Sequence, residues 1–176
     1  MSGKIVGLFL VFCAVVAGGA LYYLQIYGFY EEVPASAGPD VQLILVENNL
    51  PEPIDYAEFR AVDADSSPIR FRACFTTSEQ LDALSVRFVD AGPVTPRNAP
   101  GWFDCFDAEA IAEELRAGTA RAFIGQKNIR YGVDRIVAIT ADGRGFIWHE
   151  LNDCGEKAYD GTVVGEECPP APQADG

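Results

Sequence analysis

Histidine and closely spaced cysteines are scarce in this sequence, and their scarcity limits the chemistry it can carry. His149 is the single histidine in 176 residues. No C-x-x-C pair is present, so the ligand spacing of structural zinc sites is missing. The sequence also lacks a Gly-x-Ser-x-Gly elbow, the turn that exposes the nucleophile of many serine hydrolases. We therefore predict no catalytic residue, no metal site and no cofactor.

Basic residues are also few, and this lack disfavours nucleic acid as a partner. The chain has 13 Lys and Arg against 26 Asp and Glu, which gives a net charge of −13. Such a chain repels nucleic acid and anionic lipid over most of its surface. A basic segment runs from 116 to 144, and it supplies the candidate residues for binding a small anion: Arg121, Lys127, Arg130 and Arg135. The alternative is a solvated sheet face that balances the acidic half of the domain.

One long apolar run occupies residues 5–24. It contains no charge, and a helix of its length covers about 30 Å, the thickness of a bilayer's hydrocarbon core. A cleaved signal peptide is the alternative, since Gly18 and Ala20 supply a small-x-small cleavage site. The run continues past that site into Leu21 and two tyrosines, and Lys4 is the one charged side chain before it. These features favour a retained transmembrane helix.

The residues on either side of the run predict its orientation. Lys4 precedes it and the next basic residue is Arg60, so the positive-inside rule places residues 1–4 in the cytoplasm. Tyrosines near the far end, among them Tyr22 and Tyr27, are typical of a membrane–water interface. We therefore expect the main domain on the outer side of the membrane.

Five cysteines are present, and four of them lie beyond the apolar run. Cys13 lies inside the run, where a free cysteine packs as a small hydrophobic residue. An even number of cysteines in a domain outside the cytoplasm indicates two disulfides. Of the three pairings we favour the one that closes short loops between nearest neighbours, which is Cys74–Cys105 and Cys154–Cys168.

Composition divides the rest of the chain into three parts. Residues 31–39 contain Pro, Ala, Gly and Ser and are expected to form a linker. Residues 40–168 are sufficient for one domain with a hydrophobic core. Residues 169–176 are rich in proline, cannot continue a helix or a sheet, and are expected to form a flexible tail.

Hydrophobic periodicity predicts strands and helices within this domain. The strands are expected at 41–46, 56–62, 69–75, 120–125, 131–140 and 145–151. Thr77 or Ser78 is expected to cap a first helix that contains Leu81. Asp107 is expected to cap a second helix, and Gly118 to end it. Hairpins dominate over β-α-β crossovers, so we predict an α+β fold with a mainly antiparallel sheet and about two helices.

Two of these elements have a side that the pattern predicts to be buried. Leu84 and Phe88 lie on the same side of the first helix as Leu81. In the strand at 69–75, apolar side chains alternate with polar ones such as Arg70 and Arg72. A period of two indicates one buried face and one face exposed to water.

Three short features of the sequence occur together. They are the brief start before the apolar run, the Tyr-Tyr-Leu-Gln-x-Tyr sequence at its end, and an Asp-Gly hairpin before Phe-Ile-Trp-His-Glu. Together they resemble an uncharacterised family of bacterial single-span membrane proteins. Such proteins are sometimes labelled histidine kinase, but this sequence has no Gly-rich ATP lid, and His149 lies in a predicted strand. The resemblance implies the bacterial inner membrane, with the main domain in the periplasm, and implies no reaction.

These observations support one leading hypothesis and two alternatives. The leading hypothesis is a non-enzymatic, membrane-anchored module for protein interaction, accessory or assembly roles, whose partner is another envelope protein. The first alternative is a sensory domain that binds a small anion or other ligand on the basic segment. The second is an enzyme with an unrecognised site, which would need His149 in a cleft beside an acid and a hydroxyl or free thiol.

Overall fold

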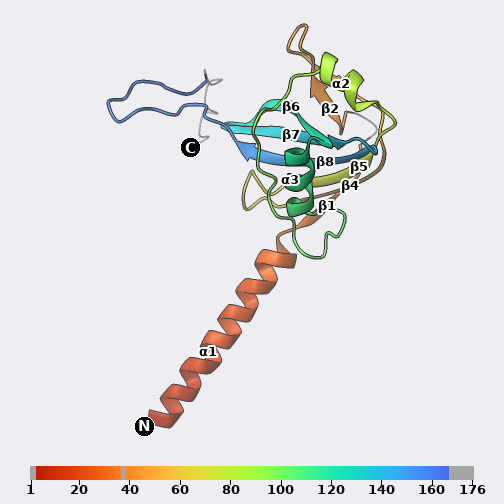
Figure 1. The fold of residues 1–176 in the computed structure, drawn as a ribbon. Coiled ribbons are helices and arrows are strands. Elements are labelled where there is room, and N and C mark those ends of the chain that lie inside the picture. The colour runs from red at the N-terminus through yellow and green to blue at the C-terminus, as the bar shows by residue number, and fades with distance from the viewer. Residues whose placement is uncertain (1–2, 37–38, 167–176) are drawn as a thin grey trace.

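A long helix leaves one end of an α+β domain (Figure 1). The computed structural model describes residues 3–36 and 39–166. Helix α1 spans Gly3–Tyr23, and one π-helical turn, η1 (Leu24–Gly28), continues it. No side chain of α1 is buried, and the stretch Gly3–Gly28 is long and apolar enough to cross a membrane.

The domain is built on a six-stranded sheet, in which all neighbouring strands pair antiparallel. In spatial order the strands are β1 (Glu31–Val33), β4 (Ala57–Asp63), β5 (Arg72–Thr76), β8 (Arg144–Leu151), β7 (Val133–Thr140) and β6 (Ala120–Arg130). A second sheet pairs β2 (Gln42–Ile44) with β3 (Pro51–Pro53). The helices of the domain are α2 (Leu81–Arg87) and α3 (Ala108–Ala117). This architecture confirms the predicted α+β fold.

Strand β1 begins only three residues after η1. It pairs with β4, and Glu32 lies opposite Val62. The segment 31–39, which composition predicted as a linker, therefore starts with an edge strand of the main sheet. As a result, the apolar helix and the sheet are joined by two residues outside regular structure, Phe29 and Tyr30.

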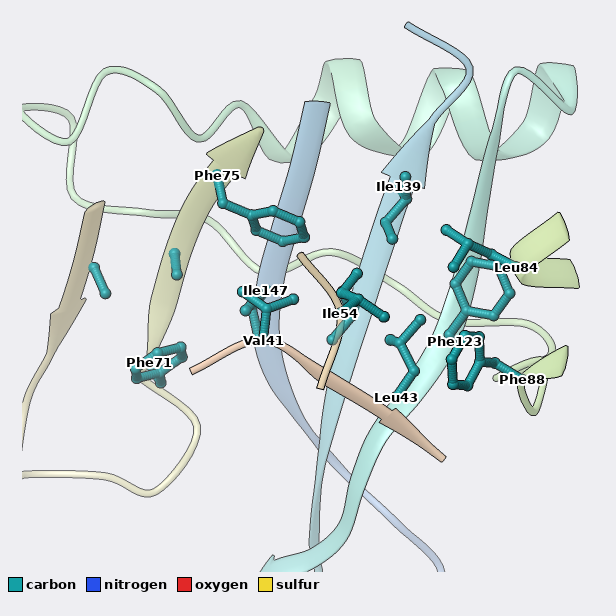
Figure 2. Packing of buried hydrophobic residues seen from close by; sticks show 13 residues of the cluster. Val41, Leu43, Ile54, Phe71, Phe75, Leu84, Phe88, Phe123, Ile139 and Ile147 are labelled. Carbon is teal, nitrogen blue, oxygen red and sulfur yellow. The ribbon is translucent and has the colours of Figure 1, made fainter. Parts of the chain in front are cut away.

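One face of the main sheet packs against β2 and α2. Figure 2 shows Val41 and Leu43 crossing over the strands that carry Ile147 and Ile139. Leu84 of α2 and Phe88, just beyond it, are buried in the same cluster, with Leu81 partly buried against it, as the helical spacing predicted.

The predicted cap of this helix is wrong. Helix α2 begins at Leu81, and Gln80 is its N-cap without a side-chain hydrogen bond. The Thr77 hydroxyl instead accepts a bond from the backbone N–H of Glu79, so it closes a turn before the helix starts. Helix α3 matches its prediction: Asp107 accepts bonds from two backbone N–H groups of the first turn, and Gly118 ends the helix with a φ of 74°.

The opposite face of the sheet is also buried, which corrects the prediction of a wet face on the strand at 69–75. Arg72 is 4% exposed and Cys74 is 7% exposed. The loop between α2 and α3 covers this face through Phe103 and Phe106, and α3 covers it through Ile111. Alternation in one strand cannot predict such a cover, because the covering residues come from a later part of the chain.

Candidate functional site

The predicted disulfide between Cys74 and Cys105 is present, with 6.3 Å between the two Cα atoms. It links β5, in the middle of the sheet, to the loop that precedes α3. The second predicted disulfide falls outside the described residues, because Cys168 is not among them, and it stays a prediction. Cys13 is a free, exposed cysteine on α1.

The four basic residues predicted for anion binding are not brought together. Arg135 lies over the Phe71 ring, 4.5 Å from its centroid, and donates a hydrogen bond from Nε to His149. Lys127 pairs with Glu166 at 2.7 Å. Arg121 and Arg130 are both exposed, and Arg121 lines a groove beside α3.

His149 is part of the packed interior. It is 4% exposed and stacks on Phe71, with 4.9 Å between the ring centroids. Its Nδ1 lies 2.8 Å from the Pro68 carbonyl oxygen, while Nε2 accepts from Arg135, which requires the tautomer with the proton on Nδ1. Burial, with a smaller contribution from the nearby guanidinium of Arg135, lowers the pKa of His149 to about 4. The ring is therefore neutral at physiological pH.

No cluster suited to a metal ion occurs within the described part of the chain. A group of three or more His, Cys, Asp or Glu side chains that could hold one is absent from residues 3–36 and 39–166. Many acidic residues of these segments are engaged with the backbone or with arginines. Asp107, for example, caps α3, and Glu114 pairs with Arg144.

At the C-terminal end of the apolar helix, the structure brings together residues from distant parts of the chain that the sequence did not single out as a site. The indole N–H of Trp102 donates to the Ile26 carbonyl at 2.7 Å, and Arg70 donates to the Gln25 carbonyl at 3.2 Å. Tyr30 lies between them: its ring meets Trp102 edge-on at 6.1 Å, and the Arg70 guanidinium lies 5.5 Å from its centroid. We call Arg70, Trp102 and Tyr30 the helix clamp.

The helix clamp supplies hydrogen-bond donors to backbone carbonyls at the C-terminal end of the apolar helix. The last carbonyls of a helix have no partner within the helix, and they carry the negative end of its dipole. An arginine and an indole N–H are suited to this end, because both donate hydrogen bonds and the arginine also adds positive charge. The clamp therefore stabilises the C-terminal end of the apolar helix against the domain.

The loop that carries Trp102 is itself fixed to the sheet. Arg72 donates from Nε to the Arg97 carbonyl at 2.8 Å and from Nη2 to the Asn98 carbonyl at 3.0 Å. The disulfide holds the same loop at Cys105, and Phe106 meets Trp148 edge-on at 6.4 Å. The helix end is thus connected through this loop to the centre of the sheet.

These contacts are not evident from the sequence. The alternation predicts a wet face for Arg72, and nothing in the sequence indicates that Trp102 binds a carbonyl 76 residues earlier in the chain. The one usable signal was the position of Arg72 and Arg70 within an otherwise apolar strand. Arginine is seldom buried without partners, so an arginine on a covered strand implies acceptors nearby.

The fold and its N-terminal helix define a class: an antiparallel α+β domain that follows a helix long enough to cross a membrane. A family model described as a family of unknown function (DUF6446) matches residues 41–169. The chain belongs to this family. No curated protein and no solved structure matches it.

Proposed function

We propose that the protein is a membrane-anchored extracytoplasmic protein of the bacterial envelope, and that it acts as an interaction, accessory or assembly module. The helix clamp is the observation that carries this proposal. It supports a helix that stays with the domain as a structural part of it, rather than a leader that is removed. The Cys74–Cys105 disulfide supports a location outside the reducing cytoplasm.

The apolar side chains near the end of the helix support retention in a second way. Leu21, Tyr22 and Tyr23 are between 56% and 63% exposed in the protein alone. Cleavage after Ala20 would leave these side chains in water on a short helical stub. A bilayer interface would instead accept the tyrosines, with their rings in the apolar region and their hydroxyls in water.

A small apolar patch at the far end of the domain is the expected contact for a partner. Val46, Leu50 and Val86 are 57%, 58% and 81% exposed. The segments that carry them are adjacent, since the backbone N–H of Val46 donates to the Arg87 carbonyl and that of Leu45 to the Leu50 carbonyl. Helix α2 and β2 lie at the end of the domain opposite to α1 (Figure 1). The patch therefore points away from the membrane in this proposal.

Site-specific photocrosslinking in membranes tests the interaction. A photoreactive phenylalanine analogue at Val86 should give a discrete crosslinked product, which the same analogue at the exposed Glu109 of α3 should not give. The product should weaken when Val46 and Leu50 are both changed to serine. Equal products from both positions, or no product from Val86, would contradict an interaction through this patch.

A reporter fusion tests the orientation separately. Alkaline phosphatase fused to the C-terminus should be active in a bacterial host, because it folds only outside the cytoplasm. An inactive phosphatase fusion together with a fluorescent cytoplasmic reporter at the same position would reverse the orientation. The enzyme alternative has less support, because His149 is buried, neutral and bonded to Pro68 and Arg135.

A further inference from the structure

In the membrane-anchored protein proposed above, the helix clamp lies where the hydrocarbon core of the bilayer ends. The apolar run of residues 5–24 covers about 30 Å as a helix, which equals the thickness of that core. Gln25 is the first residue after the run, so its carbonyl lies at the boundary with the lipid head groups. Arg70 donates to this carbonyl at 3.2 Å, and Trp102 donates to that of Ile26 at 2.7 Å. Two side chains of the domain are therefore held at the depth of the head groups.

Both side chains have the chemistry that this layer favours. A tryptophan ring is amphipathic and is enriched at membrane–water interfaces. A guanidinium group presents a fork of N–H donors that matches the oxygens of a phosphate. Arg70 uses Nη1 for the Gln25 carbonyl, and within residues 3–36 and 39–166 its Nε and Nη2 make no hydrogen bond. Because Arg70 is only partly buried, these donors are available to an acceptor from outside the protein.

The loop that carries Trp102 is held in position before any lipid binds. The disulfide fixes it to the sheet at Cys105, and Arg72 binds the Arg97 carbonyl of the same loop. Figure 1 shows this loop, which precedes α3, reaching the end of α1. A fixed side chain loses less conformational entropy on binding than a mobile one. The loop therefore presents a prepared surface to the membrane.

The carboxylates next to the helix end favour a lipid without net charge. Glu31 and Glu32 begin β1, three residues after η1, and both are exposed. They repel a head group with a net negative charge. A zwitterionic head group is not repelled in this way, and it still offers its phosphate to Arg70.

We propose that the helix clamp is a lipid-binding surface, in which Arg70 holds the phosphate of a zwitterionic phospholipid and the Trp102 ring lies in the head-group layer. The proposal rests on the membrane anchor of the proposed function, and it does not depend on the partner expected at the distal patch. It implies that the domain stands directly on the membrane, with the loop before α3 in contact with lipid.

Fluorescence quenching by spin-labelled lipids tests the position of Trp102. The full chain is placed in phosphatidylcholine nanodiscs that carry the label either on the head group or near the end of the acyl chain. Trp148, the other tryptophan, is fully buried and should not respond. The head-group label should quench the wild type more than the acyl-chain label does, and Trp102→Phe should lose this quenching.

Two failures of this experiment have different meanings. A chain that does not enter the nanodiscs would contradict the anchor itself and, with it, the lipid-binding surface. A chain that enters them but is not quenched by the head-group label, or is quenched equally in Trp102→Phe, would overturn the lipid-binding surface alone.

Solid-state NMR tests the phosphate contact in the same lipid. With ¹³C at the Cζ atoms of the arginines, recoupling to the ³¹P of phosphatidylcholine should attenuate one arginine signal. Arg70→Lys should abolish this attenuation, whereas Arg87→Lys, at the distal end of the domain, should keep it. A wild-type chain without any attenuated arginine signal, or an attenuation that survives in Arg70→Lys, would overturn the role of Arg70.

Discussion

Replacing Arg72 with methionine removes a buried cation that connects the sheet to the loop before α3. The guanidinium makes four hydrogen bonds, all to backbone carbonyls: Ile69, Phe71, Arg97 and Asn98. Burial lowers its pKa to about 10, which still leaves it charged at neutral pH. It also lies 5.7 Å from the centroid of the Phe106 ring.

The size of the loss follows from these contacts. Removing one partner from a buried ionic contact costs about 3–5 kcal/mol when a charge is left unpaired. Here the charge itself is removed, and methionine fills part of the space, so we expect the lower end, about 3 kcal/mol. Arg72→Lys should recover only part of this, because one ammonium group cannot reach carbonyls on both the strand and the loop.

Urea unfolding of the full chain in detergent micelles measures this loss. Fluorescence is a suitable signal, because Trp148 is fully buried opposite Arg72 and Trp102 lies on the affected loop. Arg130→Met is the matched control and should change the free energy of unfolding by less than about 0.5 kcal/mol, as is usual for exposed positions. A loss below about 1 kcal/mol for Arg72→Met, or an equal loss for the control, would refute the reasoning.

Three further predictions concern stability. The free energy of unfolding should fall by about 3 kcal/mol as the pH drops from 6.5 to 4, because unfolded His149 binds a proton that folded His149 excludes, and His149→Gln should flatten this profile in urea titrations. Gly145→Ala should cost about 2 kcal/mol in the same assay, because its methyl group would overlap the Phe75 ring; an unchanged midpoint would contradict this packing. Replacing Cys74 and Cys105 by serine should cost about 3–4 kcal/mol relative to the oxidised wild type, and the reduced wild type should lose at least as much; an unchanged stability would contradict this.

The parts of the fold that the sequence predicted are those determined by local pattern. The i, i+3, i+7 spacing of Leu81, Leu84 and Phe88 indicated a buried helical side. All three pack in the core on the face of the sheet that β2 and α2 cover. Asp107 and Gly118 gave the bounds of α3, because a cap and a left-handed stop depend on neighbouring residues only. The nearest-neighbour rule for cysteines identified the Cys74–Cys105 pair.

The parts that were missed depend on contacts between distant segments. Arg72 belongs to an alternating strand, but residues 25 to 34 positions later in the chain cover it and supply two of its four acceptors. The Pro, Ala, Gly and Ser content of residues 31–39 predicted a linker, and it could not reveal β1, because the partner strand β4 lies about thirty residues later. The groove beside α3 could not be predicted, since its lining comes from three separate segments, α3, β6 and the loop after α2.

The central claim is that the apolar helix is a permanent part of a protein whose domain lies outside the cytoplasm. Its most direct test is the intact mass of the protein extracted from membranes, recorded before and after reduction. The account predicts a chain that still contains residues 5–24 and that gains mass on reduction, by two hydrogens for each disulfide opened. A chain that begins beyond Ala20, or a mass that reduction leaves unchanged, would contradict it.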